Sequence, residues 1–170
     1  MVDFAVTELG PADHVDVGET APDVTRPLVN DEDWEDAALS ELYGDDPVVL
    51  VFHPMDGDFP STYVWNEIRD RGWGEHATVV GCSISSPYEH KQFIEERRLA
   101  GDYQLFSDPA NGVGEAYGIA HDLDGMAGVS EPRPSVFVVG GGGTVEYAWV
   151  STVWPEFPDY DEVEAVIAGP

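Results

Sequence analysis

The sequence predicts a three-layer α/β sandwich around a mixed central sheet. An uninterrupted apolar run at residues 48–52 and a second β-rich run at residues 78–84 predict neighbouring strands with a helical segment between them. Further helical segments follow the second run, and two β-rich runs joined by four glycines lie near the C-terminus. Strands that alternate with helices favour parallel pairing, whereas a hairpin adds antiparallel strands. A length of 170 residues suits one domain.

The first unit of this sandwich is a strand, a helix and a second, parallel strand. Residues 48–52 form a continuous apolar run that ends before Pro54, as expected of a central strand buried on both faces. Residues 78–84 have the same character. Between the two runs, residues 61–70 lack glycine and proline and carry three large apolar side chains. We therefore expect a short helix there.

The clearest helix signal follows the second strand. Ser86 can cap a helix, Pro87 suits the first helical position, and Glu89 completes a capping box. This helix is expected to run to about Leu99. Residues 103–106 then predict a short strand, which continues the alternation of helices and strands.

The last third of the chain predicts two helices on either side of a hairpin. A second capped helix is expected over residues 108–118. Residues 135–139 and 144–150 are rich in β-formers, and the four glycines between them indicate a tight antiparallel turn. A final helix is expected from a cap at Asp159 through Ile167.

The charge of the chain is strongly negative and describes its solvent more than its activity. There are 34 Asp and Glu residues against 7 Lys and Arg, so the net charge is −27. Nucleic acids and acidic membranes need clustered cations, so neither is an expected partner. At roughly 1 M salt the screening length is only about 3 Å, which relieves the self-repulsion of such a chain. We interpret the composition as that of a halophile's protein, the alternative being an acidic mesophilic one.

The chain carries no signal for export, membrane insertion or a metal. The longest clean apolar run, 48–52, is far shorter than a membrane span, and no charged leader precedes it, so we expect a cytoplasmic protein. Residues 1–16 are expected to be loosely ordered, and residues 17–170 to form the domain. Cys82 is the single cysteine, and no zinc-type spacing exists. No cofactor or metal is predicted.

Several segments resemble one known family, and they occur in the same order as in that family. The resemblance covers about residues 15–168. It is to the peroxiredoxins of the alkyl hydroperoxide reductase and thiol-specific antioxidant type. It implies a thioredoxin-like fold and, for the family, thioredoxin-dependent peroxide reduction. The matching segments are VGETAPDV at 17–24, PVVLVFHPMD at 47–56, GCSISSP at 81–87, LFSD at 105–108, AYGI at 116–119 and SVFVV at 135–139.

The family's active-site pattern is only partly present. The family has a Pro-x-x-x-Thr-x-x-Cys loop and an arginine just before the late hairpin; here Pro54 matches the proline, and Asp58 stands at the threonine position. Ser61 stands at the position of the peroxidatic cysteine, and Arg133 lies one residue early because Pro134 fills the arginine's place. A serine hydroxyl is hardly ionised near neutral pH and has no sulfenic acid state. The resemblance therefore implies a degenerate peroxidase, a binding or regulatory relative, with a peroxide or another small molecule as ligand and a homodimer as its assembly.

Two enzymatic alternatives remain open at this stage. The chain is an active thiol peroxidase if Cys82 is reactive, or if Ser61 is an engineered replacement of a cysteine; against the first, Cys82 lies in a predicted central strand and is expected to be buried. Ser61 as a hydrolase nucleophile would use His53 as base and Asp56 or Asp58 to orient it, but no GxSxG turn is present. Otherwise Ser61 is expected to be a helix N-cap.

Two further groups of residues have no assigned role in the sequence. The five histidines show no metal-ligand spacing, and most are expected to be solvated. An aromatic and proline cluster over residues 149–160 is either a cover of the core or a surface between subunits.

Overall fold

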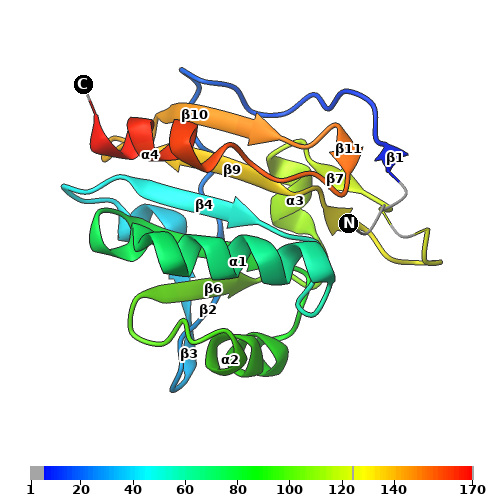
Figure 1. The fold of residues 1–170 in the computed structure, drawn as a ribbon, viewed down its shortest axis with the longest axis horizontal. Coiled ribbons are helices and arrows are strands. Elements are labelled where there is room, and N and C mark those ends of the chain that lie inside the picture. Colours follow the sequence, from blue (N-terminus) through cyan, green and yellow to red (C-terminus); the bar gives the residue numbers. More distant parts are fainter. Residues whose placement is uncertain (1–5, 124, 170) are drawn as a thin grey trace.

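The computed structural model describes residues 6–123 and 125–169, and its centre is a mixed sheet of seven strands (Figure 1). The sheet has the order β10-β9-β4-β5-β6-β2-β3. β4, β5 and β6 are parallel, and the other neighbouring pairs are antiparallel. The strands are β2 (Thr25–Val29), β3 (Trp34–Ala38), β4 (Val48–Phe52), β5 (Thr78–Ser83), β6 (Tyr103–Ser107), β9 (Ser135–Val139) and β10 (Val145–Val150).

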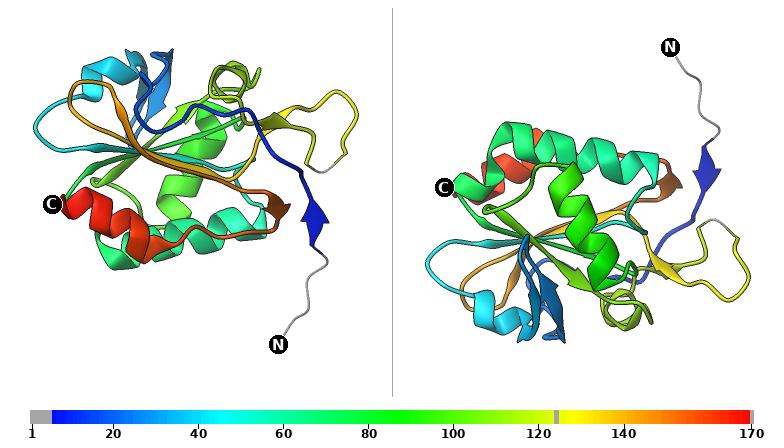
Figure 2. Two further views of the ribbon diagram at one scale, coloured as in Figure 1. Left: turned by 90° about the horizontal axis from the view of Figure 1, so that it is seen from above. Right: turned by 90° about the horizontal axis from the view of Figure 1, so that it is seen from below.

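Helices cover both faces of the sheet and complete the three predicted layers (Figure 2). One face carries α1 (Phe59–Arg71), α2 (Pro87–Glu96) and α4 (Tyr160–Ala168). The other carries α3 (Gly112–Ala116) and the 3₁₀ turn η1 (Leu39–Leu42), while a second 3₁₀ turn, η2 (Trp73–Glu75), follows α1. The thioredoxin-like α/β architecture expected from the sequence is confirmed.

The central strand β4 explains why its sequence is apolar throughout. Successive side chains of a strand point to opposite faces of the sheet. Val49 and Val51 pack in the core under α1, α2 and α4, whereas Val48, Leu50 and Phe52 pack in the core on the α3 side. Each face has its own apolar cluster, so no position of β4 can be polar.

Two helix predictions need correction. The helix after Ser86 ends at Glu96, and Leu99 lies beyond it in a turn. The helix predicted over 108–118 spans only Gly112–Ala116, because Asn111 adopts a left-handed conformation with φ of 57° and separates Asp108 from the helix. Asp108 still holds the helix start, since its Oδ2 accepts a hydrogen bond from the Val113 amide at 2.8 Å. The hairpin and the Asp159 cap are confirmed.

The sequence does not predict the short outer strands. β2 contains Pro27 and β3 reads WEDAA, so neither has the composition of an ordinary strand. The remaining pairs are β1 (Thr7–Glu8) with β11 (Val153–Trp154), and β7 (Ala120–His121) with β8 (Glu131–Pro132). β1 belongs to the segment predicted to be loosely ordered, and it runs along the outside of the domain (Figure 2).

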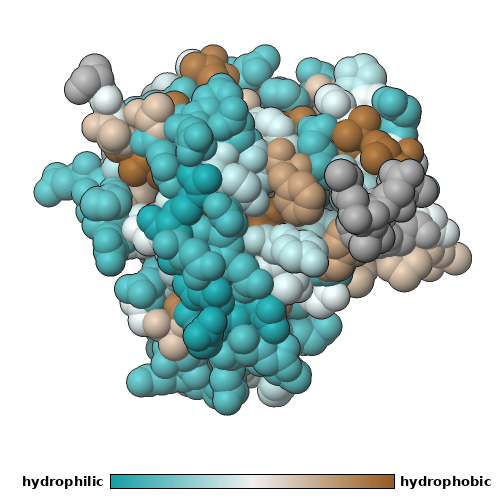
Figure 3. Space-filling view, in the orientation of Figure 1, coloured by the Kyte–Doolittle hydropathy of each residue, from teal (hydrophilic) through white to brown (hydrophobic). Residues whose placement is uncertain are grey.

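The surface agrees with the composition. The face that carries α1, α2 and α4 is covered mostly by hydrophilic side chains, with apolar ones in separate spots (Figure 3). Among the helices of the described residues, none has the length and apolar character needed to cross a bilayer.

Candidate functional site

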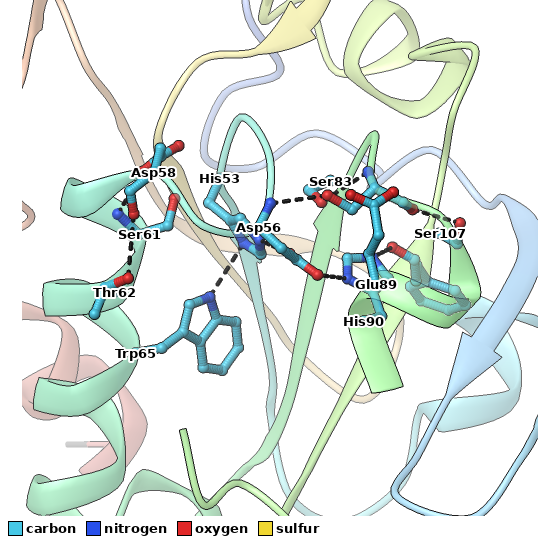
Figure 4. Close-up of polar contacts among 12 residues, drawn as sticks. His53, Asp56, Asp58, Ser61, Thr62, Trp65, Ser83, Glu89, His90 and Ser107 are labelled. Carbon is cyan, nitrogen blue, oxygen red and sulfur yellow. Dashed lines mark hydrogen bonds and ion pairs between the residues drawn. The ribbon is translucent and has the colours of Figure 1, made fainter. Parts of the chain in front are cut away.

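The candidate site is the loop from β4 to α1, where the side chain of Asp58 begins the helix. Its Oδ1 accepts a hydrogen bond from the Ser61 amide at 2.7 Å, and the Thr62 hydroxyl donates to its backbone carbonyl at 3.2 Å (Figure 4). Asp58 is therefore the N-cap of α1, and Phe59 and Pro60 are its first two residues. Ser61 stands third in the helix, so the prediction of Ser61 as an N-cap is wrong.

Ser61 is closed off from solvent. The residue is 2% exposed, and its hydroxyl has no hydrogen-bond partner among the described residues. It lines a small cavity of about 10 Å³ between the loop, β9 and the segment after β10. A cavity of this size holds about one water molecule. Ser61 shares the cavity with Pro54, Pro60, Pro134, Glu156 and Pro158.

The carboxyl of Asp58 changes the electrostatics at the start of α1. Burial raises the pKa of Asp58 above its ordinary value, and its contacts with Ser61 act in the opposite direction. Because Asp58 is the N-cap of α1, an acidic side chain already lies at the positive end of the helix dipole. An anionic group at position 61 would face this carboxyl at short range.

Arg133 is buried but directed elsewhere. Its guanidinium donates to the carbonyls of Leu9 at 3.2 Å, Gly10 at 2.7 Å and Ser151 at 3.4 Å. Burial lowers the pKa of Arg133. No hydrogen bond or ion pair of the described residues joins it to Asp58 or Ser61. The structure thus brings together Pro54, Asp58 and Ser61 and leaves Arg133 outside the group.

A buried acid between two histidines holds the other side of the loop. The Asp56 carboxylate lies 2.6 Å from His53 Nε2 and 2.6 Å from His90 Nδ1 (Figure 4). Both histidines are buried, and His90 is 0% exposed. The expectation that most histidines are solvated is therefore wrong for these two, because each one has an acidic partner inside the protein.

The hydrogen-bond partners fix where the protons lie in this group. The indole N–H of Trp65 can only donate, so His53 Nδ1, at 3.1 Å, accepts and His53 Nε2 carries the proton given to Asp56. His90 Nε2 lies 2.9 Å from the Phe106 carbonyl, which can only accept. When Asp56 is ionised its oxygens can only accept, so both ring nitrogens of His90 then donate, as in an imidazolium.

The charge state of Asp56 agrees with this assignment. Burial by itself would raise the pKa of Asp56, but the hydrogen bonds and charge of His53 and His90 outweigh it and hold that pKa well below its usual range. The Asp56 amide also donates to the Ser85 hydroxyl at 2.8 Å. The loop after β4 and the loop after β5 are thereby joined through buried polar contacts.

This network excludes the hydrolase arrangement. A general base for Ser61 needs a free ring nitrogen within hydrogen-bond reach of the hydroxyl. His53 uses one nitrogen on Trp65 and the other on Asp56. His53 therefore has no nitrogen left to activate Ser61.

His90 is not among the predicted site residues, although the sequence contains a signal for its position. Parallel neighbouring strands end at the same edge of a sheet, so the segments after β4 and β5 had to lie close together. Asp56 follows the first strand, and His90 follows the second within a clearly capped helix. That placement predicts a contact between the acid and the histidine.

The single thiol is buried in the central sheet. Cys82 lies in β5 and is buried, as predicted from its apolar neighbours. Burial, with a contribution from the nearby charge of Asp108, raises the pKa of the Cys82 thiol well above its ordinary value. Within residues 6–123 and 125–169, no three His, Cys, Asp or Glu side chains are grouped as metal ligands would be.

Comparisons with known proteins agree on one family. The model of the AhpC/TSA family matches residues 17–148. A chloroplastic 2-cysteine peroxiredoxin of Chattonella marina var. antiqua is 27% identical over 145 residues, which cover 81% of this chain and 71% of that protein. The crystal structure of peroxidoxin BcpB from Mycobacterium tuberculosis has a TM-score of 0.70 and 29% identity, covering 81% of this chain and 87% of that one. Mycobacterium tuberculosis AhpC, at 17% identity, has a TM-score of 0.72 over 91% of this chain and 92% of its own, and shows the fold alone.

Proposed function

Because this chain belongs to the AhpC/TSA peroxiredoxin family, we propose that it is a relative without peroxidase activity, which binds a small polar molecule or regulates a partner through the Ser61 loop. The observation that carries this proposal is Ser61 itself. By the resemblance of the loop at 54–61, Ser61 takes the position of the family's peroxidatic cysteine. It is a buried residue at the start of α1. Peroxide reduction needs a thiolate that attacks oxygen and becomes a sulfenic acid, which a serine cannot do.

The surroundings of Ser61 support the same proposal. Asp58 adds a carboxyl where a thiolate would need positive charge, and Arg133 gives its hydrogen bonds to backbone carbonyls. A restored thiol would therefore meet repulsion from Asp58 without help from the arginine. The adjacent cavity has a volume close to that of one water molecule, so a ligand held there must be very small.

The second candidate is a thiol peroxidase that works through Cys82. Its support is weak, because the thiol is buried in the central sheet and its pKa is raised. An engineered origin of Ser61 would leave Asp58 and the displaced arginine unexplained, since a designer has no reason to change them.

The setting that fits the charge is the cytoplasm of a halophile. A net charge of −27 on 170 residues is tolerated best where salt screens it. We keep a homodimer as the expected assembly, which sedimentation in molar KCl would test.

Peroxide consumption by the unmodified chain tests the loss of activity. With thioredoxin, its reductase or a dithiol supplied, the chain should consume hydrogen peroxide no faster than buffer. The double variant Ser61→Cys with Asp58→Thr is the matched control and should show measurable turnover, whereas Ser61→Cys alone should show little. Rapid turnover by the unmodified chain that survives Cys82→Ser would refute the proposal. Binding is tested separately by amide shifts of residues 53–62 during titration with hydrogen peroxide and other small polar molecules.

A further inference from the structure

Residues 151–158, here called the strap, cover the Ser61 site. The strap joins β10 to α4 and contains the short strand β11 (Figure 1). Glu156 and Pro158 of the strap line the cavity of Ser61. The strap is therefore one wall of that cavity, and Ser61 cannot become accessible on this side unless it moves.

Two aromatic contacts hold the strap on α1. Trp154 meets Phe59 with ring centroids 6.2 Å apart, and Phe157 meets Tyr63 at 6.4 Å, both in edge-on arrangements. Phe157 is 43% exposed and Tyr63 is 60% exposed. These contacts are partly solvated, so each contributes only modestly to the closed position.

The N-terminal segment and Arg133 hold the strap from its other side. β1 pairs with β11, and the Leu9 amide donates to the Thr152 carbonyl at 2.9 Å. Arg133 then joins the two segments, because it donates to Leu9 and Gly10 on one and to Ser151 on the other. The buried side chain of Arg133 thus connects the N-terminal segment to the first residue of the strap, Ser151.

The closed strap leaves several buried polar atoms without a protein partner. Among the described residues, these include Ser61 Oγ, Arg133 Nε, Ser151 Oγ and Trp154 Nε1. Each would be satisfied by water if the strap lifted, and each costs free energy while it is buried unpaired. Part-solvated aromatic contacts and unpaired buried atoms therefore hold the strap less firmly than the core, and weakly held segments open locally before the rest of a protein unfolds.

We propose that the strap is a gate over Ser61, with Arg133 as the latch that ties it to β1. The gate closes when Arg133 bridges Leu9, Gly10 and Ser151, and it opens when this bridge is broken. The proposal concerns access to the site, so it holds whether or not the chain binds the ligand proposed above. It also gives the N-terminal segment a role, because displacement of residues 7–10 would release the strap.

The rate at which a thiol placed at position 61 reacts with a maleimide tests the gate. The full chain with Ser61→Cys is labelled in molar KCl, and mass spectrometry follows position 61 and Cys82 separately. Phe157→Ala and Arg133→Met loosen the strap and the latch. Tyr88→Ala is the matched control, because Tyr88 is an exposed aromatic residue on α2 whose ring packs on Trp34, away from the strap.

Position 61 and Cys82 are expected to respond differently to these variants. Removal of the Phe157 ring should speed labelling at position 61 about threefold, which matches the modest stabilisation that one part-solvated aromatic pair provides. Removal of the Arg133 bridge should speed it more, because three hydrogen bonds to Leu9, Gly10 and Ser151 are lost. Cys82 should stay slow in every variant, and Tyr88→Ala should change neither rate. Equal labelling at position 61 in all variants would overturn the gate. A parallel rise at Cys82 in Phe157→Ala would also overturn it, since position 61 would then become accessible only when the whole fold opens. Phe157→Ala changes a half-exposed side chain and keeps the test available if Arg133→Met fails to fold.

Discussion

The two sides of the Ser61 loop are held by opposite means. On the α2 side, Asp56 is bound by His53 and His90. Both carboxylate oxygens and all four ring nitrogens of these residues have a hydrogen-bond partner. On the strap side, the buried atoms Ser151 Oγ and Trp154 Nε1 have no hydrogen-bond partner among the described residues. A fully satisfied buried network stiffens the structure around it, whereas a partly satisfied one weakens it. We therefore expect the wall of the site beside α2 to be rigid and the wall formed by the strap to move.

Loss of the Asp56 carboxylate should have the largest effect on this comparison. Asp56→Asn leaves the His90 cation buried without its counter-charge, and removal of one partner from a buried pair costs about 3–5 kcal/mol of the free energy of unfolding. Urea denaturation in molar KCl measures this loss. Asp70→Asn is the control, because Asp70 is exposed, and its effect should stay within about 0.5 kcal/mol. A loss below about 1 kcal/mol for Asp56→Asn would mean that His90 is neutral in the folded protein.

Salt should stabilise the folded chain by less than the amount that Asp56→Asn removes. It should leave the Asp56 network unaffected. Between about 0.1 M and about 2 M KCl, screening of exposed carboxylates should add roughly 2–3 kcal/mol, or about 5–10 °C in the thermal midpoint. Buried pairs are screened little, so the penalty of Asp56→Asn should be the same at both salt concentrations. Calorimetry of both proteins gives the two numbers. A thermal midpoint that does not change with salt would contradict the halophile interpretation.

Acid should have the smallest effect on the comparison between the unmodified chain and Asp56→Asn. The effect should be a difference in how steeply their free energies of unfolding fall at low pH. The folded pKa of Asp56 lies below its unfolded value, so the network contributes stability above about pH 4 and loses it as the pH falls further. The unmodified chain should therefore lose stability more steeply than Asp56→Asn in this range. Denaturation curves at a series of pH values between neutrality and the acid limit measure the difference. Identical slopes would show that Asp56 has an ordinary pKa.

Local sequence patterns were sufficient to predict most strands of the central sheet and the main helices. The apolar run of β4 predicted a central strand because burial on both faces favours apolar side chains throughout, and the mostly apolar β5 predicted its neighbour. The capping residues located α2 and α4. The edge strands β2 and β3 could not be predicted in this way. Their pairing is set by neighbours in the sheet, and Pro27 and the acidic residues of β3 conceal it.

At the site, the amino acids set which chemical groups are present, whereas the packing of distant segments sets which of these groups meet. The residues at 58 and 61 already excluded thiolate chemistry at these positions, because that depends on the side chain's own atoms. Whether Arg133 faced them could not be known, since its direction depends on the carbonyls of Leu9 and Gly10, far away in the chain. The partnership of Asp56 with His90 likewise arises only where two parallel strands end side by side. Local identity fixes what a group can do, and only long-range packing fixes its neighbours, its charge and its access to solvent.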